Sequence, residues 1–114
     1  MKIGIIIPCY NEEKGVKIKA FKKCLKKYSD VHLCFVNDGS KDNTLDVLYK
    51  LKDEFEKKVT IINMKKNQGK SRAIKVGARF FYSLSSVAHV GCLDANFTIG
   101  YENFGSLLKN LKKI

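Results

Sequence analysis

With 114 residues, of which 45% are hydrophobic and 29% charged, the chain can bury one modest core, so we expect a single domain over residues 1–114. One proline, four cysteines without CxxC spacing and apolar runs far shorter than the roughly 20 residues of a membrane span exclude collagen-like, disulfide-scaffold and transmembrane classes, which predicts a cytoplasmic protein with reduced cysteines. The net charge of +11 favours an anionic partner, but only Arg72 and Arg79 are arginines. Because base-edge recognition prefers the guanidinium group, nucleic acid is not the favoured partner.

Apolar residues alternate along the chain between continuous runs and helical spacing. Continuous runs predict strands at 3–7, 31–36, 59–62 and 87–93. Apolar residues three and four apart predict amphipathic helices around 21–28, 48–55, 73–84 and 104–111, the last of which is expected to run to the end of the chain. This order predicts an α/β fold, a Rossmann-like parallel sheet flanked by helices and connected by right-handed crossovers.

A polar cluster directly follows each predicted strand. The four clusters are Tyr10-Asn11-Glu12-Glu13, Asn37-Asp38-Gly39-Ser40, Asn67-Gln68-Gly69-Lys70 and Asp94-Ala95-Asn96. In parallel sheets of this kind, ligands bind outside the carboxyl ends of the strands, where the strand order reverses. We therefore expect all four clusters to meet at one edge of the sheet.

The first two clusters each allow a structural and a ligand-binding interpretation. Asn11 could cap the first helix, with the following acids in its positive first turn. Alternatively, the ring of Tyr10 could lie against a nucleobase while Glu12 accepts hydrogen bonds from the base or ribose. Asp38 could accept in the same way, although its surroundings are also typical of a plain turn.

The last two clusters offer groups for phosphate and metal. Lys70 and the glycine before it open a helix, which presents backbone donors and positive charge to phosphate. The absence of GxGxxG and GxxxxGK[ST] argues against an ordinary dinucleotide site or P-loop. If the chain stays extended after the fourth strand, the oxygens of Asp94 and Asn96 could meet one Mg²⁺ or Mn²⁺ ion, although a turn without a ligand is the alternative.

Taken in order, these segments resemble the family 2 glycosyltransferases of GT-A fold, and most of all the branch that contains the dolichyl-phosphate mannose and glucose synthases. The matching segments are 7–13, 36–44, 67–73 and 93–96. The resemblance covers the nucleotide-binding half of the family's catalytic domain, so the chain is expected to be truncated and to lack the acceptor-binding half. It implies a glycosyltransferase that moves a sugar from a nucleotide diphosphate donor with inversion at the anomeric carbon.

The resemblance also implies roles for single residues. It places Pro8, Tyr10, Glu12 and Asp38 at the nucleoside, Lys70 and Arg72 beside the nucleotide, Asp94 at the ribose, and Asp94 with Asn96 at a divalent ion, Mg²⁺ or Mn²⁺. Asn37 and Asn96 replace acids that are frequent in the family, and the lost charge at Asn96 is expected to weaken metal binding. Asp94-Ala95-Asn96 occupies the position of the family's D-x-D motif. No catalytic base is identified, because the family supplies it from the half of the domain that follows this motif.

These observations lead to one main hypothesis and two alternatives. The main hypothesis is a domain that binds a UDP- or GDP-sugar with a divalent metal, for transfer to an unidentified acceptor that could be lipid-linked. A lipid-linked acceptor would place the protein at the cytoplasmic face of a membrane. The alternatives are a non-catalytic lysine-rich module that binds nucleic acid or an anionic membrane, and a homo-oligomer formed through the exposed sheet edge.

Overall fold

The computed structural model describes residues 2–113. The elements in order are β1 (Lys2–Cys9), α1 (Ile18–Lys27), β2 (Val31–Asp38), α2 (Thr44–Glu54), β3 (Val59–Met64), α3 (Lys70–Tyr82), β4 (Val87–Cys92), the 3₁₀-helix η1 (Tyr101–Asn103), α4 (Phe104–Lys109) and β5 (Lys112–Lys113). The predicted alternation of strands and helices is confirmed. β5 is the addition that the sequence pattern did not indicate.

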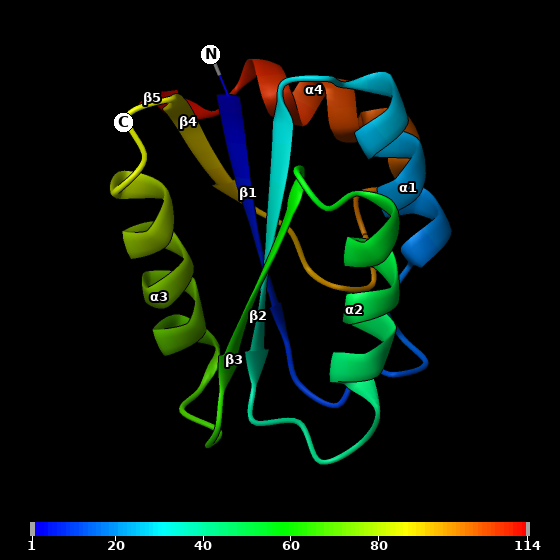
Figure 1. The fold of residues 1–114 in the computed structure, drawn as a ribbon. Helices are drawn as coiled ribbons and strands as arrows, with labels where there is room; N and C mark the ends of the chain where they lie inside the picture. Colours follow the sequence, from blue (N-terminus) through cyan, green and yellow to red (C-terminus); the bar gives the residue numbers. More distant parts are fainter. Residues whose placement is uncertain (1, 114) are drawn as a thin grey trace.

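The strands form one sheet in the order β3-β2-β1-β4-β5, with β1 to β4 parallel. The chain leaves β1 in one direction to reach β2 and β3, then returns to the other side of β1 for β4, so the strand order reverses next to β1. Helices α1, α2 and α4 cover one face of the sheet and α3 covers the other (Figure 1). This architecture confirms the predicted Rossmann-like α/β fold.

The central strands are buried on both faces, which explains their continuous apolar runs. Successive side chains of a strand point to opposite faces of the sheet. Ile5 and Phe35 therefore lie in the core beneath α1, α2 and α4, whereas Ile6 and Cys34 lie in the core beneath α3. All four side chains are at most 1% exposed.

The C-terminal helix is shorter than its apolar spacing predicts. α4 ends at Lys109, and Lys112–Lys113 pair antiparallel with β4 instead of continuing the helix. Leu111 lies on the extended segment between them and still packs against the main core, close to Gly91 of β4. Extended backbone therefore meets the same burial requirement as a helical turn, which is why the spacing of apolar residues did not show where the helix ends.

The cysteines are free, as expected, and three of the four are buried. Burial raises the pKa of Cys24 and of Cys34 to about 12, so both thiols stay protonated and pack as small apolar groups. Cys92 is exposed at the end of β4. Within residues 2–113, the helices are all too short or too polar to span a bilayer.

Candidate functional site

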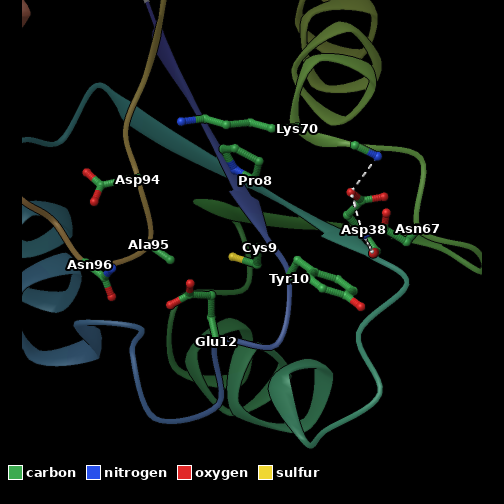
Figure 2. Close-up of a pocket in the computed structure, with 11 residues that line it drawn as sticks. Pro8, Cys9, Tyr10, Glu12, Asp38, Asn67, Lys70, Asp94, Ala95 and Asn96 are labelled. Carbon is green, nitrogen blue, oxygen red and sulfur yellow. Dashed lines mark hydrogen bonds between the residues drawn. The ribbon is translucent and has the colours of Figure 1, made fainter.

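A cavity of about 310 Å³ lies at the carboxyl ends of the parallel strands, where the strand order reverses (Figure 2). Its lining residues are Pro8, Cys9, Tyr10, Glu12, Asp38, Asn67, Gly69, Lys70, Asp94, Ala95 and Asn96. Each of the four polar clusters contributes to this lining, so the structure brings them together as the sequence predicts. Arg72 is the one predicted site residue that does not line the cavity: it is exposed in the first turn of α3.

Reciprocal hydrogen bonds join the β1–α1 loop to the β2–α2 loop. The backbone N–H of Asn11 donates to Ser40 Oγ (2.9 Å), and Asn11 Oδ1 accepts from the backbone N–H of Lys41 (2.8 Å). One residue on, the backbone N–H of Glu12 donates to Thr44 Oγ1 (2.8 Å). These bonds hold the loop that carries Tyr10 and Glu12 against its neighbour, and they orient both side chains at the cavity.

The alternative in which Asn11 caps the first helix is therefore wrong. Helix α1 begins at Ile18, well after Asn11, and its first turn holds no acidic residue. Asn11 has a φ of +51°, a left-handed conformation that asparagine tolerates better than most residues. Glu13 also bonds across the loops, because its Oε1 accepts from the backbone N–H of Asn43 (3.2 Å).

Asp38 is a buried carboxylate, 3% exposed, that binds the β3–α3 loop. Its Oδ1 accepts from the backbone N–H of Gln68 (2.7 Å), and its Oδ2 accepts from the N–H of Gly69 (3.0 Å) and from Asn67 Nδ2 (3.2 Å). Gly39 permits this contact, since its φ is +67° and a Cβ there would lie 2.4 Å from Asn67 N. Asp38 therefore sets the position of the loop at the start of α3, besides lining the cavity.

Asn37, where the family frequently has an acid, uses both ends of its amide. Its Nδ2 donates to Asn63 Oδ1 (3.0 Å) on the paired strand β3, and its Oδ1 accepts from the hydroxyl of Ser40 (2.5 Å). The side chain is 3% exposed, so each of these polar atoms needs a partner. A carboxylate could not donate to Asn63, and the amide is therefore matched to this neighbour.

The carboxylate of Asp94 uses one of its two oxygens in hydrogen bonds to the described residues. Its Oδ1 accepts from the backbone N–H (3.2 Å) and the hydroxyl (2.8 Å) of Thr98, and Oδ2 accepts no hydrogen bond from residues 2–113. Burial disfavours the charged form, but the bonds from Thr98 and the positive charge of Lys70 outweigh it and hold the pKa of Asp94 below its usual value. Asp94 is therefore anionic at neutral pH.

The chain does not stay extended after β4, which corrects the expectation for the fourth cluster. It turns directly after Asp94, closed by a hydrogen bond from the backbone N–H of Phe97 to Asp94 O (3.0 Å). The side chain of Asn96 then lies beside Glu12 (Figure 2). With its amide oriented so that the nitrogen faces the two acceptors there, Nδ2 donates to Glu12 Oε2 (3.3 Å) and to Gly15 O (2.8 Å). The strand face that Asp94 and Asn96 were expected to share is absent.

The oxygen donors fit a divalent cation only in part. Within residues 2–113, no three His, Cys, Asp or Glu side chains are grouped so that they could hold a metal ion. Asp94 supplies one ionised carboxylate, a hard oxygen donor that suits Mg²⁺ or Mn²⁺. This donor fits an ion that takes most of its ligands from water and from a phosphate-bearing ligand.

The rest of the cavity combines an aromatic ring, a cation and a neutral thiol. Tyr10 is 42% exposed, so its ring is available to stack on a planar ligand. Lys70 extends from the start of α3 toward the side of the cavity that holds Asp94 (Figure 2). Burial, with the charge of Glu12 adding to it, raises the pKa of Cys9 to about 12, so this thiol is no nucleophile at neutral pH.

Sequence reasoning missed several residues that shape the cavity. Asn67 belongs to a recognised cluster, but its bonds to Asp38 depend on the contact between two loops. Cys9 and Ala95 adjoin predicted site residues, and their position next to a strand end was the available signal. Thr98 gave no signal of its own, because a threonine four residues after an acid is common in chains without any ligand.

One protein family matches nearly the whole chain. The family model described as Glycosyl transferase family 2 matches residues 4–114. The uncharacterized protein MJ0544 of Methanocaldococcus jannaschii is 37% identical over 111 residues, which are 94% of this chain and 45% of that protein. The poly-beta-1,6-N-acetyl-D-glucosamine synthase of Staphylococcus aureus is 27% identical over 110 residues, 96% of this chain and 25% of the synthase. The chain therefore spans less than half the length of these curated relatives.

Solved structures share the fold. TarS 1–349 of Staphylococcus aureus in complex with UDP-GlcNAc superimposes with a TM-score of 0.63 at 20% identity, over 96% of this chain and 31% of the TarS 1–349 chain. The mannosyltransferase PcManGT of Pyrobaculum calidifontis in complex with GDP-Man and Mn²⁺ gives a TM-score of 0.69 at 19% identity, over 83% of this chain and 27% of PcManGT. The dolichyl-phosphate branch stays a prediction. The match over residues 4–114, together with a GT-A fold, shows that the chain belongs to the family 2 glycosyltransferases.

Proposed function

We propose that the strand-end cavity binds a nucleotide diphosphate sugar with the help of a divalent cation, and that the sugar is transferred with inversion to an acceptor. The observation that carries this proposal is the convergence on one cavity of four residues from separate segments of the chain, Tyr10, Asp38, Lys70 and Asp94. An aromatic ring, buried acceptors, a cation and a partly free carboxylate are the groups that a base, a ribose, phosphates and a metal ion respectively require.

The nucleoside part of the ligand fits the side of the cavity formed by the first two loops. Tyr10 offers an exposed ring for the base, and Glu12 offers a carboxylate for ribose or base donors. Asp38 already accepts three hydrogen bonds, and a carboxylate has about four lone-pair sites, so it can accept one more from a base. Pro8 completes this wall of the cavity.

The phosphates fit the side that holds Lys70 and Asp94. The ammonium group of Lys70 is a donor for a phosphate oxygen, and the ionised carboxylate of Asp94 can hold a ribose hydroxyl or a cation. A bound Mg²⁺ or Mn²⁺ would supply charge neutralisation for the departing diphosphate. Arg72 lies outside the lining, so we assign Lys70 rather than Arg72 to the phosphates.

The ligands of the structural neighbours support UDP- and GDP-sugars as the ligands to try first. TarS 1–349 is in complex with UDP in one structure and with UDP-GlcNAc in another, and PcManGT is in complex with GDP-Man and Mn²⁺. The acceptor, which could be lipid-linked, and the base that deprotonates it are not assigned to residues of this chain. Cytoplasmic or membrane-face action and self-association through the sheet edge also stay predictions.

Calorimetry on the 114-residue chain tests the proposal. We expect UDP-GlcNAc or GDP-mannose to bind in the presence of MnCl₂ or MgCl₂, and to bind at least about tenfold more weakly in EDTA, which corresponds to about 1.4 kcal/mol. The variant Arg72→Ala is the matched control, because it removes a positive charge next to the cavity without touching its lining. The absence of binding by either sugar with either metal would reject the proposal.

A further inference from the structure

The amide of Asn96 links the segment after β4 to the loop after β1. Its Nδ2 lies 3.3 Å from Glu12 Oε2 and 2.8 Å from Gly15 O. Both partners are acceptors, so they assign the amide orientation: the opposite one would direct Oδ1 at two other oxygens. Asn96 is therefore a donor toward Glu12, and Figure 2 shows the two side chains beside one another at the wall of the cavity.

The backbone around this pair is closely packed. A Cβ at Gly15 would overlap Glu12 Oε2 and the amide end of Asn96, so a larger residue there would displace these two side chains. The backbone N–H of Lys17 donates to Ala95 O (3.0 Å), which ties the same two segments together a few residues away. The carboxylate of Glu12 is thus confined between its own loop and Asn96.

The family's D-x-D pattern would place an acid at position 96. In this chain a carboxylate there would meet the carboxylate of Glu12 at hydrogen-bonding distance, and two like charges in contact repel each other. The amide of Asn96 replaces this repulsion with a hydrogen bond to a charged acceptor, which is stronger than a bond between neutral groups. The exchange of acid for amide therefore matches the presence of Glu12.

We infer that Asn96 is a positioning residue for Glu12 and not the cation ligand that the sequence pattern predicts. It holds the Glu12 carboxylate at the cavity, ready to accept from the nucleoside of the ligand without a metal, and leaves Asp94 as the protein carboxylate for the cation. This inference rests on the proposed function, because it assigns the nucleoside to the side of the cavity where Glu12 lies.

Metal-free binding of UMP and GMP separates the two roles of Asn96. In EDTA, we expect the wild-type chain to bind one of these monophosphates, and Asn96→Ala and Asn96→Asp each to weaken that binding by about tenfold, the equivalent of one hydrogen bond to a charged group. A cation ligand would behave differently. Both variants would then bind the monophosphate in EDTA as the wild type does, and that result would overturn the inference.

A reversed pair shows whether the contact itself is responsible. In Glu12→Gln/Asn96→Asp the amide and the carboxylate change places, so the hydrogen bond can form again with the opposite polarity. We expect the double variant to regain the thermal stability that Asn96→Asp loses, while its affinity for the monophosphate stays low because Glu12 is gone. Equal melting temperatures of Asn96→Asp and the double variant would count against the inference. Ser29→Asp is the control, since it adds the same charge to an exposed loop between α1 and β2.

Failure of the inference and failure of the proposed function give different results. A wild-type chain that binds neither nucleotide sugar nor monophosphate, with or without Mn²⁺, rejects the proposed function. A wild-type chain that binds the nucleotide sugar with Mn²⁺ but binds no monophosphate in EDTA rejects the inference alone, because Glu12 would then not grip the nucleoside without the metal. Circular dichroism at the binding temperature confirms that each variant is folded when affinities are compared.

Discussion

The ends of β2 and β4 carry the same residue type in the same topological position, yet the two aspartates are used differently. Asp38 accepts three hydrogen bonds from the loop after β3 and is 3% exposed. The carboxylate of Asp94 accepts only from Thr98 in its own segment, and its second oxygen accepts nothing from residues 2–113. The first carboxylate mainly holds the protein together, whereas the second is available to a ligand.

The source of the donors explains this difference. The donors to Asp38 lie about thirty positions away in sequence, so its charge is compensated by a packed neighbouring loop. The donors to Asp94 lie four positions away, and such a local turn occupies one oxygen and leaves the other without a hydrogen bond from residues 2–113. A motif can therefore mark both acids without showing which of them is free.

The largest expected effect is on stability, and it concerns Asp38. Asp38→Ala leaves the backbone N–H groups of Gln68 and Gly69 without their acceptor in a poorly hydrated place, so we expect the free energy of unfolding to fall by about 3 kcal/mol, as for other buried charged acceptors. Urea unfolding followed by circular dichroism measures this loss. A change below about 0.5 kcal/mol, the usual range for surface substitutions, would remove the distinction between the two aspartates.

The second prediction concerns Asp94, where we expect a small effect on stability and a clear effect on metal-dependent binding. Asp94→Ala loses only a local bond to Thr98, so we expect the free energy of unfolding to change by no more than about 1 kcal/mol. Binding of the nucleotide sugar should lose its dependence on MnCl₂, because the ionised carboxylate for the cation is gone. Calorimetry with MnCl₂ and with EDTA gives the comparison. If Asp94→Ala keeps the full metal dependence, Asp94 is not the cation's ligand.

The third prediction concerns the positive charge opposite Asp94. Lys70→Ala should weaken binding of the nucleotide sugar by about tenfold, since one charge-assisted hydrogen bond to phosphate is lost. Arg72→Ala removes an equal charge outside the lining and should change the affinity less than twofold, a difference of about 0.4 kcal/mol. Calorimetry under identical salt conditions compares the two variants. Equal losses would indicate a general charge effect instead of a contact in the cavity.

The last prediction concerns pH, at the other end of β2. Burial, with the charges of Lys2 and Lys52 adding to it, lowers the pKa of His32 from 6.5 to about 4. The unfolded chain therefore binds a proton between pH 6.5 and 4 that the folded chain does not, so His32 makes stability fall as the pH falls through this range. Above pH 6.5 this contribution is constant.

The variant His32→Gln tests the sign of this effect, because it removes the titrating side chain. Glutamine can still bond to Thr60 Oγ1, the partner of His32 Nε2 at 2.8 Å, but it does not titrate. We expect the free energy of unfolding of His32→Gln to decline less than that of the wild type between pH 6.5 and 4. Parallel pH profiles of the two proteins would show that His32 carries no such penalty.

Much of the fold could be predicted because its signals are local. The continuous apolar runs of β1 and β2 and the helical spacing in α3 each lie within one element, and the sequence pattern reports them directly. The meeting of the four polar clusters could also be predicted, because the carboxyl ends of parallel strands share one edge of a sheet. The end of α4 could not, since Leu111 reaches the core from extended backbone.

The roles of single side chains depended on partners far away in the chain. Asn11 bonds to residues 29 and 30 positions away, whereas the local sequence pattern indicated Asn11 as a helix cap. Asn96 faces Glu12 from the opposite end of the sequence, where an extended strand would have directed it beside Asp94. Rules based on residue spacing along the chain do not predict these contacts.

The sequence by itself determined the order of the four parallel strands and their helices, the family and the edge of the sheet at which the polar clusters meet. Periodic burial and the topology of parallel sheets are sufficient for those conclusions. Only the tertiary structure decided that Asp38 is committed to a neighbouring loop, that Asp94 keeps a free oxygen and that Asn96 serves Glu12. The physical reason is that a polar side chain acts according to the donors and acceptors around it, and these are assembled from distant segments only when the chain folds.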